Sequence, residues 1–194
     1  VVVETIGANA FRGCTSLQNV MLPDSLRKID DNAFEGDGKL LKLEVPKNVE
    51  TIGNYAFRGC SGLTNVTLSD NLKTIGDNAF ENNSSLSKLI IPQNVTSIGM
   101  SAFKGCRKLE WVDLPSKLEK IDQYAFENCT NLTTIISRLD SIIIDIDENV
   151  FTSIYDKATL FVPMPADSVD AYDNSTIQLY RAANGWKNFI TSIG

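Results

Sequence analysis

The sequence predicts a right-handed α/β solenoid, in which similar coils stack along one axis and form a parallel β-sheet on the concave side. The dipeptide Ala-Phe recurs every 23 residues, and a leucine follows six residues after each phenylalanine. The phenylalanines are Phe11, Phe34, Phe57, Phe80, Phe103 and Phe126. A strict period of about 20 to 30 residues indicates a solenoid, because each unit buries its apolar face only against its neighbours.

The first element of each unit is a strand of the form Leu-x-x-Val-x-Leu, as in Leu63, Val66 and Leu68. Val66 and Leu68 are two residues apart, which places them on the same buried face of the strand. Proline follows this strand in most units, and it ends the strand because it has no N–H to donate. These prolines are Pro23, Pro46, Pro92 and Pro115.

The second element is a short extended segment on the return side of each coil, marked by an apolar pair such as Leu72 and Ile75. The next position holds only Gly or Asp, which predicts either a positive φ or a helix N-cap. We then expect the Ala-Phe dipeptide to lie in one or two helical turns on the convex side. Every Leu, Ile and Phe at the repeat positions described above is predicted to be core.

The array ends in a less regular region. Phe126 and Phe151 are 25 residues apart, and we expect a degenerate last unit from about residue 139. Residues 1–163 therefore form the repeat domain, with about six 23-residue units before the degenerate one. Residues 164–194 form a helical cap, because an open end would expose apolar side chains and a sheet edge. The chain begins in the middle of a repeat, which predicts more repeats or another domain before it.

The composition argues against several classes of function. The net charge of −6, with scattered Lys and Arg, does not fit a nucleic-acid-binding protein. No apolar run approaches the ~20 residues of a membrane span, so we expect no membrane insertion. The chain has no histidine, which excludes Ser-His-Asp and Cys-His catalysis within it. No nucleophile has a recognisable base, so we predict a protein without enzyme activity or cofactor, and a monomer.

The four cysteines share one repeat position. They are Cys14, Cys60, Cys106 and Cys129. Cysteines two coils apart are separated by ~10 Å, beyond the ~7 Å limit for a disulfide. Cysteines on adjacent coils point in parallel, so we expect free, partly buried thiols. A row along a solenoid cannot converge on one ion, and the acidic residues near Asp147 lack the spacing of a calcium-binding loop. We predict no metal site.

The outward-facing residues of the strands form the candidate binding surface. The third and fifth residues of each strand point away from the core. The candidate ligand-binding residues are Trp111, Ile90, Lys88, Asp113, Asn65, Thr67, Lys42 and Glu44. Trp111 is expected to lie diagonally from Ile90, with charged neighbours, an arrangement typical of a binding hot spot. Alternatively, Trp111 only covers its neighbours on a surface that binds nothing.

The repeat resembles a known family. Residues 91–109 read I-P-x-x-V-x-x-I-G-x-x-A-F-x-G-C-x-x-L, a phrase similar to that of BspA-like leucine-rich repeat proteins. The resemblance covers about residues 1–163. The C-terminal stretch that follows also resembles the usual end of such proteins in Bacteroidetes. The resemblance implies a secreted or cell-surface bacterial protein, an adhesin for host matrix proteins, mucosal proteins or other bacteria. Two alternatives remain: carbohydrate binding, with Trp111 as a stacking platform, and an architectural spacer.

Overall fold

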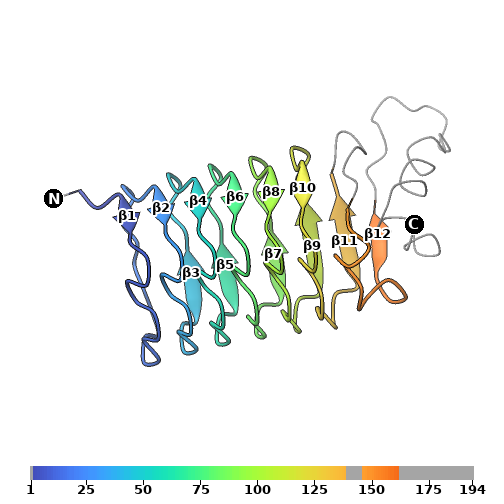
Figure 1. Cartoon of the computed structure of the whole chain (residues 1–194), viewed down its shortest axis with the longest axis horizontal. Coiled ribbons are helices and arrows are strands. Elements are labelled where there is room, and N and C mark those ends of the chain that lie inside the picture. Colours follow the sequence, from blue (N-terminus) through green and yellow to red (C-terminus); the bar gives the residue numbers. More distant parts are fainter. Residues whose placement is uncertain (1, 139–145, 162–194) are drawn as a thin grey trace.

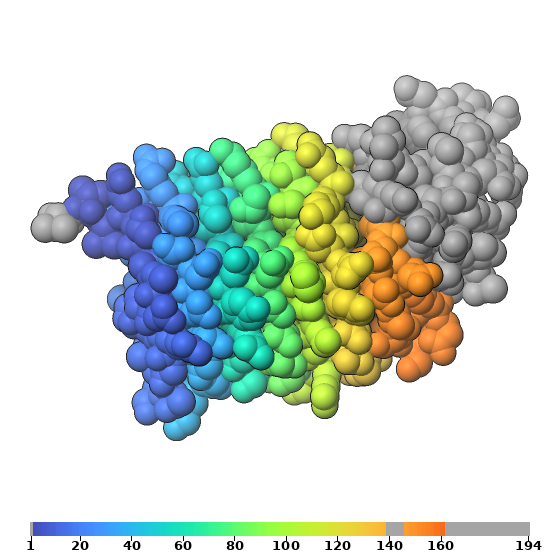
Figure 2. Space-filling model, viewed as in Figure 1, coloured from blue at the N-terminus to red at the C-terminus, as the bar shows by residue number. Residues whose placement is uncertain are grey.

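The computed structural model describes residues 2–138 and 146–161. Within them the chain forms coils that stack side by side along the long axis of the molecule (Figures 1 and 2). This arrangement confirms the predicted solenoid. The predicted C-terminal cap and the start of the degenerate last unit lie outside the described residues.

One side of the solenoid carries a six-stranded parallel sheet of two-residue strands, in the order β1-β2-β4-β6-β8-β10. The strands are β1 (Thr5–Ile6), β2 (Lys28–Ile29), β4 (Thr51–Ile52), β6 (Thr74–Ile75), β8 (Ser97–Ile98) and β10 (Lys120–Ile121). Each strand pairs with its equivalent in the next coil, for example Ile75 with Ile98. These strands are the predicted return segments, and their isoleucines are buried.

The other side carries the longer strands in two separate parallel sheets. A two-stranded sheet pairs β3 (Lys42–Glu44) with β5 (Asn65–Thr67). A four-stranded sheet contains β7 (Lys88–Ile90), β9 (Trp111–Leu114), β11 (Thr134–Ser137) and β12 (Thr159–Phe161), in the order β12-β11-β9-β7. One continuous sheet was predicted, whereas pairing is interrupted between β5 and β7. The predicted first strand, residues 17–22, is also not formed.

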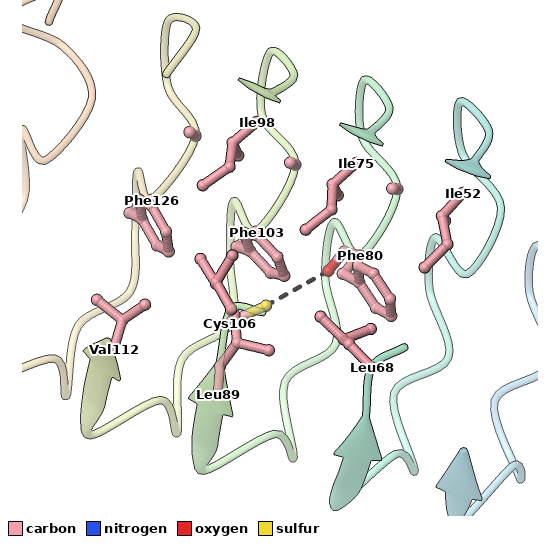
Figure 3. Packing of buried hydrophobic residues seen from close by; sticks show 14 of the residues in the cluster. Ile52, Leu68, Ile75, Phe80, Leu89, Ile98, Phe103, Cys106, Val112 and Phe126 are labelled. Atoms are coloured by element: carbon pink, nitrogen blue, oxygen red, sulfur yellow. Dashed lines mark hydrogen bonds between the residues drawn. The ribbon is translucent and has the colours of Figure 1, made fainter. Parts of the chain in front are cut away.

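The core is built around a column of phenylalanine rings. Six successive pairs, from Phe11–Phe34 to Phe126–Phe151, stack with centroids 5.0–5.4 Å apart and planes within 13° of parallel. Figure 3 shows Phe80, Phe103 and Phe126 in this column, flanked by leucine, valine and isoleucine from the strands on both sides. The side chains of all three are fully buried. The predicted core role is confirmed for Phe34, Phe57, Phe80, Phe103 and Phe126, whereas Phe11, in the first coil, is stacked on Phe34 but exposed.

The prediction of helical turns on the convex side is wrong, because the described residues contain no helix. The residue before each alanine, such as Asn78 or Ser101, has a positive φ of 55° to 62°. A second left-handed residue follows two positions after each Phe, usually a glycine such as Gly105. Two left-handed residues so close together interrupt a right-handed helix. The backbone bonds to the next coil instead, as in Phe80 N–H to Ala102 O at 2.7 Å.

The position restricted to Gly and Asp also has a different cause from the predicted one. None of its glycines has a positive φ. A Cβ on Gly99 would lie 2.5 Å from Asp77 Oδ1 and 2.6 Å from Asp77 N in the previous coil. Gly53 and Gly76 face Asp31 and Asn54 in the same way.

The side chain of the previous coil explains the choice between the two residue types. Asp77 Oδ1 accepts a hydrogen bond of 2.8 Å from the N–H of Met100, the residue after Gly99. Asp30 and Asp122 instead follow coils that carry Ala8 and Met100 at the Asp77 position. Glycine therefore stands where an Asp or Asn of the coil before reaches across, and aspartate stands where none does.

Candidate functional site

The outward side chains of β3, β5, β7, β9, β11 and β12 form one surface, which we call the long-strand face. Burial alternates along these strands: Leu89 is buried between exposed Lys88 and Ile90 on β7. All eight residues predicted to bind ligand lie on strands of this face. Their placement follows from the two-residue period of a strand.

Strand register brings four of them together. Lys88 pairs with Trp111, and Ile90 pairs with Asp113, so Ile90 and Trp111 are diagonal neighbours. The side chain of Ile90 is 64% exposed, and Trp111 is half-buried. Lys88 forms no ion pair within residues 2–138 and 146–161. We call Trp111, Ile90 and Lys88 the Trp111 patch.

Asp113 is held by a residue that sequence reasoning missed. Arg138 Nε lies 2.7 Å from Asp113 Oδ1 and 2.9 Å from Oδ2, and these contacts raise the pKa of Arg138. Arg138 occupies the repeat position of Pro92 and Pro115, and this departure was the available signal. The pair neutralises Asp113, which is therefore a poorer candidate for contacting a ligand than Lys88.

Lys42 and Glu44 lie apart from the patch, on β3. Lys42 Nζ is 2.5 Å from Glu44 Oε1, so these two charges satisfy each other. Asn65 and Thr67 on β5 are their neighbours in register, and both side chains are exposed. The eight candidates thus divide between the two sheets of the long-strand face.

A groove of about 420 Å³ lies where the two sheets separate. Five of the predicted residues line it: Asn65, Thr67, Lys88, Ile90 and Trp111. The others, which the sequence did not indicate, are Thr64, Val66, Leu68, Asp70, Ser87 and Pro92. Val66 is half-buried, whereas Leu43 and Leu89 at the same repeat position are buried. The separation therefore opens the surface nearly to the core.

The cysteines contribute no reactive group to this face. Cys60, Cys106 and Cys129 are free and buried, and each Sγ donates to a phenylalanine carbonyl at 3.1–3.3 Å. Burial raises the pKa of Cys60 and of Cys106 to about 12. Such thiols are not nucleophiles at neutral pH. Cys14 is also free but exposed, contrary to the prediction that all four are partly buried.

Metal and membrane chemistry find no support in the part of the chain that the structure describes. It contains no group of three or more His, Cys, Asp or Glu side chains placed to hold one ion. It also contains no helix with the length and apolarity to cross a bilayer. What the long-strand face offers is a surface with a shallow, mixed polar and apolar groove.

The chain matches a family model described as "BspA type Leucine rich repeat region", in six copies over residues 2–99 and 73–179. No curated protein matches it. Several solved structures of bacterial proteins are similar. A leucine-rich repeat protein from Bacteroides ovatus has 30% identity and a TM-score of 0.65 over 84% of this chain. One from Eubacterium ventriosum has 27% identity and a TM-score of 0.71 over 89%.

A third similar structure is the pneumococcal vaccine antigen PcpA, with 26% identity and a TM-score of 0.60 over 73% of this chain. The matches cover only part of each relative. The chain spans 41% of the Bacteroides ovatus protein, 44% of the Eubacterium ventriosum protein and 35% of the pneumococcal antigen.

Proposed function

This chain belongs to the BspA-type leucine-rich repeat family, and on that premise we propose that it is a non-catalytic interaction module of a bacterial cell surface. We further propose that it acts as an adhesin for host matrix or mucosal proteins. A repeat of this family is a protein-interaction module, and one of the similar structures is a pneumococcal vaccine antigen.

The observation that carries the proposal is the Trp111 patch. Ile90 exposes most of its side chain beside an aromatic ring and a lysine that has no ion-pair partner in the described part of the chain. Aromatic anchors with an apolar neighbour and flanking charge are enriched at the centres of protein interfaces. The rigid column of stacked coils beneath the patch limits the entropy lost on binding.

The test is a binding measurement on the 194-residue chain. Immobilised matrix proteins and mucins are screened by surface plasmon resonance, and each positive is repeated with the Trp111→Ala/Ile90→Ala double variant. We expect at least one ligand, whose affinity falls by about thirtyfold in the variant, as for a hot spot worth ~2 kcal/mol.

A matched control separates the patch from the fold. Ile136 occupies the repeat position of Ile90, two strands away on β11. The Ile136→Ala variant should bind as tightly as the unchanged chain. If no matrix protein or mucin of the panel binds, the adhesin proposal is overturned. If Ile136→Ala loses as much affinity as the double variant, the Trp111 patch is not the binding site.

A further inference from the structure

The hydrogen bonds that join neighbouring coils beside the long strands fail at one place. At the strand starts, each coil donates an N–H to the carbonyl of the coil before, at 2.9–3.1 Å. The pairs are Leu41–Gln18, Thr64–Leu41, Glu110–Ser87 and Thr133–Glu110. Across residues 2–138 the equivalent bond from Ser87 N–H to Thr64 O is missing from this series.

The same failure occurs where these strands end. Val45 N–H donates to Thr67 O at 2.9 Å, and Ile91 N–H donates to Asp113 O at 3.4 Å. The corresponding bond from Leu68 N–H to Ile90 O is not formed between these two described residues. Two donors and two acceptors of the backbone therefore face one another across the groove between β5 and β7.

The gap is too narrow for a strand of a partner protein. Insertion of a strand needs about 9.6 Å between its neighbours, twice the usual strand spacing. Cα atoms of β5 and β7 still lie within 8 Å of one another. The coils cannot spread further, because β6 and β8 are paired on the opposite side and Phe80 stacks on Phe103 at 5.4 Å between them. Main-chain recognition by β-augmentation is thereby excluded.

Hydroxyl groups of a ligand can pair with these backbone groups, whereas an inserted strand does not fit between them. A hydroxyl both donates and accepts, so one hydroxyl can bridge an N–H and a C=O that stand too far apart to bond directly. The two unpaired positions are four residues apart along one strand and three along the other, about 10–13 Å, which calls for a ligand with several hydroxyls in a row. Asn65, Thr67 and Ser87 add neutral amide and hydroxyl groups to the same groove.

The other residues that line the groove are suited to the apolar C–H face of a sugar ring. The half-buried indole of Trp111, with Ile90 and Pro92, gives the groove an apolar wall against which the C–H face of a pyranose can pack. The charged groups of the lining are Lys88 and Asp70, whose charges cancel, and the chain as a whole carries −6. The electrostatic potential around the groove therefore adds little to the affinity for an acidic ligand.

We propose that the groove between β5 and β7 binds a short, uncharged oligosaccharide, with its hydroxyls toward the unpaired backbone groups and one ring against Trp111. This inference rests on the proposed function and names the ligand chemistry of the same face. On a mucosal glycoprotein, the recognised part would be its glycan.

The test begins with an array of neutral and sialylated oligosaccharides of two to six rings, probed with the 194-residue chain. Calorimetry with the strongest neutral hit follows. We expect binding that is unchanged in 0.5 M NaCl and is weakened about tenfold or more by Asn65→Ala. Asn19→Ala is the matched control, since Asn19 occupies the same repeat position outside the groove and should leave affinity unchanged.

A second variant addresses the backbone groups themselves. Ser87→Pro removes one donor that makes no hydrogen bond within the described fold, so the variant should keep its melting temperature and lose affinity. Absence of any neutral hit, or full affinity in both Asn65→Ala and Ser87→Pro, would overturn the glycan site. Binding of a matrix or mucosal protein that persists after enzymatic deglycosylation would also overturn it, while leaving the proposed interaction module intact.

Discussion

Asp37 occupies a position at which other coils carry a hydrogen-bond donor. Cys60, Asn83, Cys106 and Cys129 each donate from this position to the carbonyl of a phenylalanine 26 residues earlier. Asp37 is equally buried, and neither of its carboxyl oxygens has a hydrogen-bond partner of good geometry in the described structure, although the nearby backbone N–H of Cys14 partly offsets the effect of burial on its pKa. Burial raises the pKa of Asp37 to about 6, because an ionised carboxylate there is poorly solvated.

Asp37→Asn should therefore stabilise the protein in a pH-dependent way. The pKa is higher in the folded chain than the ordinary 3.8, so protonation favours folding. The contribution of Asp37 to stability is full below about pH 4 and is lost as the pH rises through about 6. At pH 7.5 we expect Asp37→Asn to raise the free energy of unfolding by about 1–3 kcal/mol, and at pH 4 to change it little.

Urea denaturation at both pH values measures this difference. Asn83→Asp, at the same repeat position, is the reciprocal control and should destabilise the chain at pH 7.5 more than at pH 4. An equal gain for Asp37→Asn at both pH values would contradict the assignment of the effect to ionisation.

The thiols should differ sharply in reactivity. Cys14 is exposed, whereas burial raises the pKa of Cys60 and Cys106 to about 12 and that of Cys129 well above its usual value. Because only the thiolate reacts, a thiol reagent at pH 8 should label one cysteine per folded chain quickly and all four in urea. Cys14→Ser should abolish the fast phase, and a fast phase that remains would contradict this burial pattern.

At the scale of the repeated elements, the turns are shaped by contacts between coils rather than within them. The Asp and Asn side chains of one coil accept N–H groups of the next, as Asn54 Oδ1 does from Asp77 N–H at 2.8 Å. These side chains, together with the backbone beside them, take the space in which a Cβ would lie at the following glycine position. Residues 23 positions apart are therefore coupled in pairs.

Gly99→Ala tests this coupling in a double-mutant cycle with Asp77→Ala. We expect Gly99→Ala alone to cost about 1–3 kcal/mol, because its Cβ is too close to Asp77. In the Asp77→Ala background the same change should cost at least ~0.5 kcal/mol less. Gly7→Ala is the control, since no atom lies within 4 Å of its Cβ position, and it should be nearly neutral. Strict additivity of the two changes in chemical denaturation would contradict a role of the Asp77 side chain and would leave the clash with the backbone of Gly76 and Asp77.

For the molecule as a whole, stability accumulates along the stack. Within residues 2–138 and 146–161, each coil contacts its neighbours through the sheets and the column of phenylalanine rings (Figures 1 and 3). Such an array behaves as a sum of unit and interface terms. Coils can then be added without changing the fold of the others.

Insertion of a second copy of residues 86–108 directly after residue 108 should give a folded, more stable protein. At 0.05–0.15 kcal/mol per residue, 23 added residues are worth about 1–3 kcal/mol. Urea denaturation should also show a steeper transition, because unfolding exposes more surface. A lower midpoint with an unchanged slope would indicate that the added coil does not join the stack.

At the groove the tertiary structure departs from the repeat. The 23-residue period continues unbroken through Leu63 and Leu86, so the sequence predicts equal pairing on both sides of β5. Whether two strands pair depends on the distance between their backbones, which is set by packing across the whole coil. The sequence indicated Asn65, Thr67, Lys88, Ile90 and Trp111 as surface residues, but it could not indicate that they share one groove.

The sequence by itself determined the stacked coils, the two strands per coil, the buried column of phenylalanines and the outward positions of the candidate residues. It could do so because each follows from a short pattern repeated at a fixed step. The turns that replace the predicted helices, the ion pair of Arg138 with Asp113 and the interrupted sheet were decided only by the tertiary structure. These features depend on distances between coils, and a one-dimensional pattern carries no such distance.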